Sequence, residues 1–123
     1  RCTAKHDAAA VAELESLYLQ AARESIAESR EASHEIFSRD VPYVLLMHVS
    51  AMSAHMMPQL LQLYREAGFR FVSLPAAESD PVYRAYTDPR LPPPPTPQEL
   101  AKAKHVQLER APDHSARLNA ICT

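Results

Sequence analysis

A histidine at the end of an apolar run is the residue of this sequence best placed to do chemistry. His48 closely follows the apolar residues 43–47, and a helical pattern begins within a few residues after it. An imidazole acts as a general acid or base near neutral pH, and parallel-sheet proteins bind ligands at the carboxyl ends of their strands. A buried histidine that is hydrogen-bonded to the main chain is the alternative, and position alone favours neither interpretation.

No local motif for a metal ion or a serine nucleophile accompanies His48. The remaining histidines have neither a four-residue spacing nor a His-Glu-x-x-His pattern, and no cysteine pair has zinc-site spacing. We interpret four of them as surface residues, namely His6, His34, His105 and His114. His55, in the first turn of the second predicted helix, either lies near the same rim as His48 or is solvated, which is the commoner case. Without a Gly-x-Ser-x-Gly turn, Ser50 and Ser53 are interpreted as loop and helix-cap residues. Tyr83 and Tyr86 either stack on a sugar or pack under their loop, which is the commoner role.

The elements that would position His48 alternate between helix and strand. A helix is predicted from Asp7, a good N-cap, to about Phe37, with a bend or break left open after Ile26. Short apolar runs predict buried strands over 43–49 and 69–74. Between them, a second helix is predicted from Ser53 or His55 to Ala67, with Pro58 near its start and Gly68 as its left-handed C-terminal cap. This strand–helix–strand order predicts an α/β fold with parallel strands.

After the second strand the chain becomes irregular. Short turns are predicted over 75–79 and at Asp80-Pro81. Residues 88–97 contain six prolines and predict an extended connector. Thr96, Pro97 and Glu99 form a capping box that predicts a short helix to about His105.

Composition excludes several classes of function. The formal net charge of −2 indicates no nucleic acid or anionic membrane as a partner, and no apolar run is long enough to span a membrane. Because the first residue is Arg1, we expect a processed product or an excerpt. Cys2 and Cys122 either form a disulfide, which would favour an oxidising compartment, or are unrelated thiols. The compartment stays open, with secretion or the periplasm as the candidates.

Residues 43–83 resemble the closing portion of the polysaccharide deacetylases, the family of chitin and peptidoglycan deacetylases. Leu46 and His48 match the family's Leu-x-His motif at the end of an apolar strand. The helix end at 63–69 and the segment 69–83 match as well, and together they read YREAGFRFVSLPAAESDPVY over residues 64–83. The ensemble is fairly specific, although each piece alone is a weak signal.

The resemblance implies a fold. This chain would be the C-terminal βαβ part of a distorted (β/α) barrel, with a long N-terminal helix and a proline-rich irregular tail. Residues 1–87 would belong to the barrel, and residues 88–123 would form the connector, the short helix and the tail.

The resemblance also implies an activity, the metal-dependent hydrolysis of sugar N-acetyl groups in an acetylated polysaccharide or oligosaccharide. His48 would be the general acid that protonates the departing amine, and Leu46 would line the acetyl pocket. The family's Thr-Phe-Asp-Asp-Gly type motif, its His-x-x-x-His pair and its active-site tryptophan do not occur in this sequence. We therefore expect the upstream part of the same protein to hold a divalent, zinc-like metal, and this chain alone to bind none and to be inactive.

A non-catalytic, deacetylase-like module with a glycan-binding or structural role is the alternative, followed by an α/β fragment with no function of its own.

Overall fold

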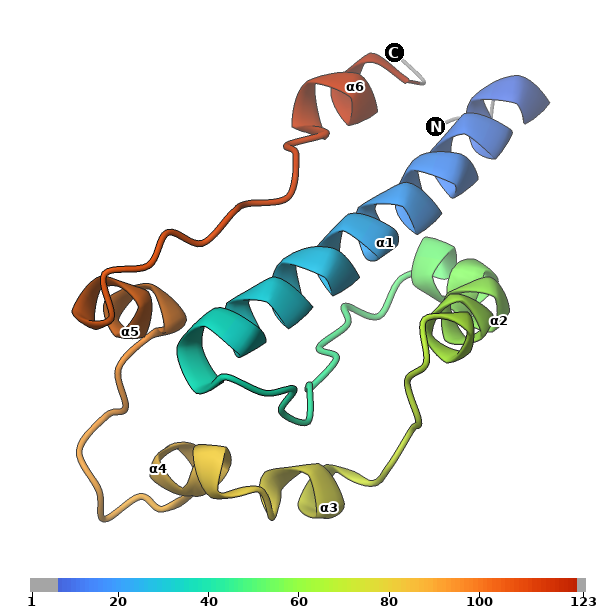
Figure 1. Ribbon diagram of the computed structural model, residues 1–123. Coiled ribbons are helices and arrows are strands. Elements are labelled where there is room, and N and C mark those ends of the chain that lie inside the picture. The colour runs from blue at the N-terminus through green and yellow to red at the C-terminus, as the bar shows by residue number, and fades with distance from the viewer. Residues whose placement is uncertain (1–6, 122–123) are drawn as a thin grey trace. The chain divides into compact units, whose positions relative to one another are not determined.

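The computed structural model describes residues 7–121, and within this range it contains helices and irregular segments but no β-strand (Figure 1). The elements are α1 (Ala8–Phe37), α2 (Ala51–Glu66), α3 (Leu74–Glu78), the 3-10 helix η1 (Pro81–Tyr83), α4 (Arg84–Thr87), α5 (Pro97–Ala103) and α6 (Ser115–Ala120). The fold is all-α. The predicted α/β fold, the C-terminal βαβ part of a distorted (β/α) barrel, is therefore wrong.

The error lies in the two apolar runs that were interpreted as strands. Residues 43–49 carry no regular secondary structure, and neither do residues 69–73, while Leu74 begins α3. A strand makes its main-chain hydrogen bonds with another segment, and a parallel sheet needs cover on both faces. An apolar run shows that a segment is suited to a strand, but it does not supply the neighbouring strands. His48 consequently does not lie at the end of a strand.

Helix α1 is the longest element, with 30 residues. Its predicted N-cap is confirmed, because Asp7 Oδ1 accepts a hydrogen bond from the Ala10 N–H at 2.9 Å. The helix continues past Ile26 without interruption, so the break that the sequence also allowed there does not occur. It ends at Phe37, after which Ser38 adopts a left-handed conformation with φ of 58°.

The chain divides into two compact units. The first contains residues up to 27, residues 48–69 and residues from 110 onward. Its buried side chains lie on α1 and α2, and they are Ile26, Met56, Leu60 and Leu63. Three acidic residues of α1 pair with side chains of the other segments: Glu15 with His55, Glu24 with His114, and Glu13 with Arg117. The large buried side chains of this unit thus lie on two helices, and polar side-chain pairs connect α1 to the other segments of the unit.

Helix α2 begins and ends with recognisable caps. Ser50 Oγ accepts the Ser53 N–H at 3.0 Å, so Ser50 is the N-cap and the helix starts earlier than predicted. Pro58 consequently lies inside the helix, and its predicted place near the start is wrong. The Gly68 prediction is confirmed: its φ is 85°, and the Phe69 N–H donates to the Tyr64 carbonyl at 2.9 Å. The Phe69 ring packs edge-on against the Tyr64 ring.

The second unit contains residues 28–47 and 70–109. Its buried residues are Ser33 and three apolar residues, Ile36, Ala77 and Ala101. The predicted capping box is confirmed at α5, where Thr96 and Glu99 each accept from the other's main-chain N–H. The proline-rich residues 92–96 have no regular secondary structure, as the sequence predicts. Only Ile36 among these buried residues is large, so the unit has little apolar core.

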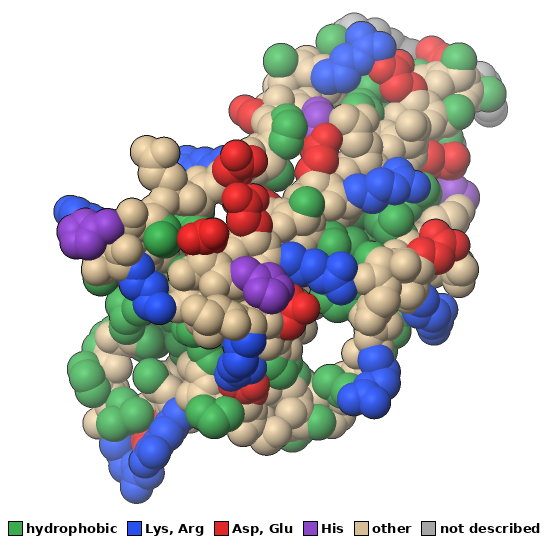
Figure 2. Space-filling model, in the orientation of Figure 1, with side chains coloured by type: hydrophobic (Ala, Val, Ile, Leu, Met, Phe, Trp, Pro, Cys, Tyr) green, Lys and Arg blue, Asp and Glu red, His purple; other side chains and the backbone are tan. Residues whose placement is uncertain are grey.

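Charged side chains are mixed on the surface. On the face drawn in Figure 2, acidic and basic residues are interspersed, in keeping with the formal net charge of −2. None of the described helices is long and apolar enough to cross a membrane. The proposed pairing of Cys2 with Cys122 lies outside the described residues.

Candidate functional site

The two residues singled out by the sequence lie on the irregular segment between α1 and α2. Leu46 is 88% exposed, and the His48 side chain is also exposed. Neither side chain makes a hydrogen bond or ion pair with another described residue. Both are therefore accessible from solvent in this structure.

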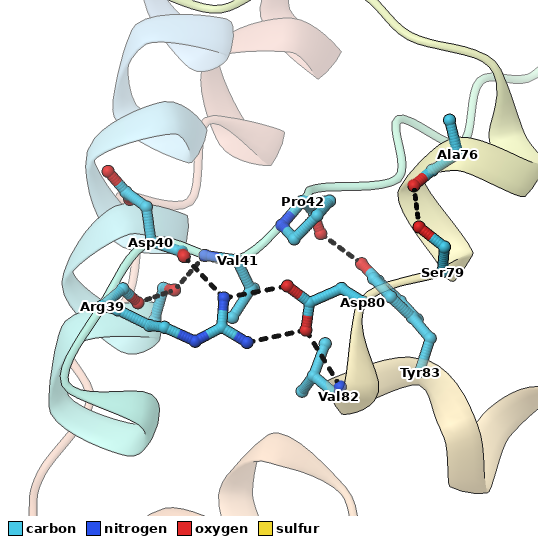
Figure 3. A network of polar contacts seen from close by, with 10 residues as sticks. Arg39, Asp40, Val41, Pro42, Ala76, Ser79, Asp80, Val82 and Tyr83 are labelled. Carbon is cyan, nitrogen blue, oxygen red and sulfur yellow. Dashed lines mark hydrogen bonds and ion pairs between the residues drawn. The ribbon is translucent and has the colours of Figure 1, made fainter.

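The start of this segment is held by a polar network that the sequence did not reveal (Figure 3). Its first member is Ser33, which is 3% exposed near the end of α1. The Ser33 hydroxyl donates to the Arg39 carbonyl at 2.7 Å and accepts the Val41 N–H at 3.1 Å. One buried hydroxyl thus folds the chain back against the helix that it has just left.

The second member is an arginine–carboxylate pair that connects residues far apart in the sequence. Arg39 Nη1 and Nη2 donate to the two carboxylate oxygens of Asp80 at 2.9 and 2.6 Å. Asp80 Oδ1 also accepts the Val82 N–H at 3.0 Å and so caps η1. The hydrogen bonds from Arg39 and then from Val82 lower the pKa of Asp80, and the same carboxylate raises the pKa of Arg39.

Two tyrosines complete the network. The Tyr83 hydroxyl donates to the Pro42 carbonyl, and the Tyr43 hydroxyl donates to Asp40 Oδ1 at 2.6 Å. Burial is the main cause of a raised pKa in both phenols. We name these contacts the clasp (Ser33, Arg39, Asp40, Pro42, Tyr43, Asp80 and Tyr83). Within it, the Arg39–Asp80 and Tyr83–Pro42 bonds connect residues 39–43 to the turn at 80–83 (Figure 3).

The hydroxyl groups of the two tyrosines considered for sugar stacking are both used within the second unit. Tyr83 bonds the Pro42 carbonyl, and Tyr86 donates to the Pro95 carbonyl at 2.9 Å. Their rings meet edge-on, with centroids 6.3 Å apart. These contacts favour the interpretation that the pair packs around its loop.

The far end of the segment is held by the Ser50 cap of α2. Between the two anchored ends, residues 44–49 make no hydrogen bond to another described residue. The clasp belongs to the second unit and the cap to the first, and the segment between them connects the two units. Sequence reasoning missed the clasp because its partners are separated by 41 positions, which leaves no local pattern. Its only local signal was the Asp80-Pro81 turn.

The described residues offer no ready metal site. No group of three or more histidine, cysteine or acidic side chains suited to a metal ion occurs within residues 7–121. Histidines pair singly with acidic residues instead: His55 Nε2 lies 2.8 Å from Glu15 Oε1, and His114 Nε2 lies 2.6 Å from Glu24 Oε2. The hydrogen bond from His114, with a smaller effect from Gln20, lowers the pKa of Glu24.

The clasp predicts a pH dependence of stability. The pKa of Asp80 is lowered from its ordinary value of 3.8, so its pair with Arg39 stabilises the folded chain above that pH. The contribution is lost as the pH falls through the lowered value, because the folded chain must then bind a proton. We expect Asp80→Asn, which keeps a cap for η1, to lower the melting temperature at neutral pH and to match the wild type only once the pH has fallen below the lowered pKa of Asp80.

The measurement is the melting temperature of both proteins across this pH range. Arg39→Lys is the second variant, because lysine keeps the positive charge but cannot donate the two parallel hydrogen bonds to the Asp80 carboxylate. A difference between wild type and Asp80→Asn that does not change with pH would show that the ion pair does not stabilise the clasp.

In comparisons with known proteins, no protein-family model, no curated protein and no solved structure matches the chain.

Proposed function

We propose that this chain is a segment of a metal-dependent polysaccharide deacetylase. The observation that carries the proposal is the combined run of residues 43–83, which resembles the closing portion of that family. Within this run, His48 is the general acid and Leu46 lines the pocket for the acetyl methyl group. The substrate class is an acetylated polysaccharide or oligosaccharide.

The chemistry of amide hydrolysis explains why a histidine of this kind is needed. The reaction requires an activated water, stabilisation of the tetrahedral oxyanion and a proton for the departing amine. Histidine is the side chain that most often acts as general acid or base in such proton transfers. In this chain the role falls to His48, whose exposed ring has no competing partner among residues 7–121.

The position of Leu46 relative to His48 also supports the proposal. The Leu-x-His spacing places an apolar residue two positions before the proposed proton donor, which is the spacing of the family motif that the sequence resembles. Both side chains are exposed, so a substrate can reach them.

The metal expected of this family does not fit the described residues, which lack a suitable group of ligands. We therefore assign the metal and the catalytic base to other residues, in the upstream part of the same protein. The role of this chain is confined to donating the proton and contacting the acetyl group. A module that binds glycan without catalysis is the competing function, and it would lack those upstream ligands.

The proposal predicts a contrast in activity. The isolated chain should release no acetate from an N-acetylated chitooligosaccharide, with or without added zinc or cobalt, because two of the three chemical requirements are missing. A polypeptide that extends the reading frame upstream of Arg1 should release acetate under the same conditions. The measurement is acetate produced over the uncatalysed rate, with heat-denatured protein as the control.

Two outcomes would contradict the proposal. One is turnover by the isolated chain. The other is an upstream reading frame in which the aspartate pair and the His-x-x-x-His pair are missing or replaced, and this outcome would favour the non-catalytic module.

A further inference from the structure

A run of four prolines lies on the surface of the second unit, between α4 and α5. Leu91 leads into the run and is 42% exposed. Pro92, Pro93 and Pro95 are exposed as well, while Pro94 is half-buried. The proline ring fixes φ at about −65°, and a residue that precedes a proline is restricted to extended conformations. Residues 92–95 are therefore held close to a polyproline II helix, in keeping with their lack of regular secondary structure.

Contacts within the second unit hold both ends of this run. Before it, the Leu91 N–H donates to the Asp88 carbonyl at 3.1 Å and closes a turn. After it, the Thr96 capping box starts α5. The Tyr86 hydroxyl also donates to the Pro95 carbonyl at 2.9 Å. These contacts limit the conformations open to the run, so less conformational entropy is lost when a partner binds it.

The chemistry of the run decides what kind of surface can cover it. Residues 92–95 have no main-chain N–H, so they cannot pair as a strand with a second copy of the chain. Residues 91–98 carry no charged side chain, which leaves nucleic-acid phosphates without a partner. The carbonyls of residues 92–94 accept no main-chain hydrogen bond within the described range 7–121, and lipid tails supply no donor. The run therefore needs a protein surface that offers both apolar contact and hydrogen-bond donors.

Tryptophan and tyrosine side chains offer both. Their rings pack against apolar surface, and the indole N–H and the phenol O–H donate hydrogen bonds. Tyr86 makes a contact of this kind with the Pro95 carbonyl from within the unit. A polyproline II helix has three residues per turn, so Pro92 and Pro95 lie on one edge, and both are exposed. Two prolines at this spacing are what aromatic-lined grooves recognise.

We propose that residues 91–95 are a docking segment for a protein domain whose binding groove is lined by tryptophan and tyrosine. The rings of Pro92 and Pro95 enter the groove, and donors of the groove bind the open carbonyls of the run. The segment lies outside residues 43–83, which carry the proposed function. The inference therefore goes beyond that function and does not depend on it.

The test is a titration of the purified chain into three purified domains that bind proline-rich segments: an SH3 domain, a WW domain and an EVH1 domain. Each is chosen to carry a tryptophan in its groove. The chain itself contains no tryptophan, so a change in tryptophan fluorescence reports the groove alone. We expect saturable binding to at least one of the three domains.

Matched proline variants identify the segment. The double variant Pro92→Ala with Pro95→Ala removes both rings of the exposed edge and frees the backbone. It should raise the dissociation constant by about tenfold or more. Pro112→Ala is the control, because Pro112 is also exposed on an irregular segment but stands outside the run. It should change the dissociation constant by less than about twofold. Circular dichroism verifies that each variant keeps its helices.

Three results would overturn the inference. They are an absence of binding to all three domains, binding that the double variant leaves unchanged, and equal weakening by the double variant and Pro112→Ala. A failure of the extended polypeptide to release acetate would count against the proposed function alone, since the fluorescence titration does not depend on catalysis.

Discussion

If the proposed function holds, replacing His48 with alanine in the complete protein is expected to lower kcat for deacetylation by about 10²–10⁴-fold. The reason is that the departing amine must then take its proton from water. Metal affinity should stay nearly unchanged, because a general acid is not a metal ligand. The measurement is kcat together with the dissociation constant for zinc.

The matched control is His55→Ala. His55 lies seven residues further along, on α2, where its imidazole contacts Glu15. We expect this variant to change kcat little. Equal losses from both histidine variants, or a loss of metal binding in His48→Ala, would contradict the role of His48 as proton donor. Leu46→Ala should have a weaker effect than His48→Ala, chiefly because it loosens the acetyl pocket.

Truncating Met56 to alanine is expected to lower the free energy of unfolding by about 2–5 kcal/mol. Met56 is 1% exposed in α2 and is the most deeply buried large side chain among the described residues. Its truncation leaves a cavity at this buried position or forces the surrounding side chains to shift. The free energy of unfolding of a small domain is only about 5–15 kcal/mol, so this single substitution removes a large share of the stability.

Met57→Ala is the matched control for this prediction. Met57 is the next residue of the same helix and is only partly buried. Urea denaturation followed by far-ultraviolet circular dichroism should show a clearly smaller loss for Met57→Ala. Similar losses in the two variants would mean that Met56 does not sit in the main core of the first unit.

Helix ends could be predicted from the sequence because their signals are local. Asp7, Gly68 and the Thr96–Glu99 box each act within a few residues of the helix end that they complete. The position of Pro58 was misjudged for a related reason, since α2 starts at the Ser50 cap rather than near Ser53. Local chemistry therefore fixed the type of these elements better than their exact starting residue.

Strand formation could not be predicted in the same way. Residues 43–49 and 69–74 have the apolar composition of buried strands, but a strand exists only with neighbours that complete its hydrogen bonds. The described residues provide no such neighbour. The clasp could not be predicted for the same reason, because its Arg39–Asp80 pair joins residues 41 positions apart in the sequence. Leu46 and His48 were singled out by sequence, and the elements that hold their segment became visible only in the structure.

The central claim is that His48 is a proton donor. Its most direct test is to measure both kcat and the melting temperature of the His48→Gln variant of the complete protein. Glutamine can keep a hydrogen bond to the main chain but cannot deliver a proton as imidazolium does. The account predicts a variant that melts like the wild type while its kcat falls by about 10²-fold or more. A well-folded His48→Gln protein with near-normal kcat would remove His48 from the mechanism.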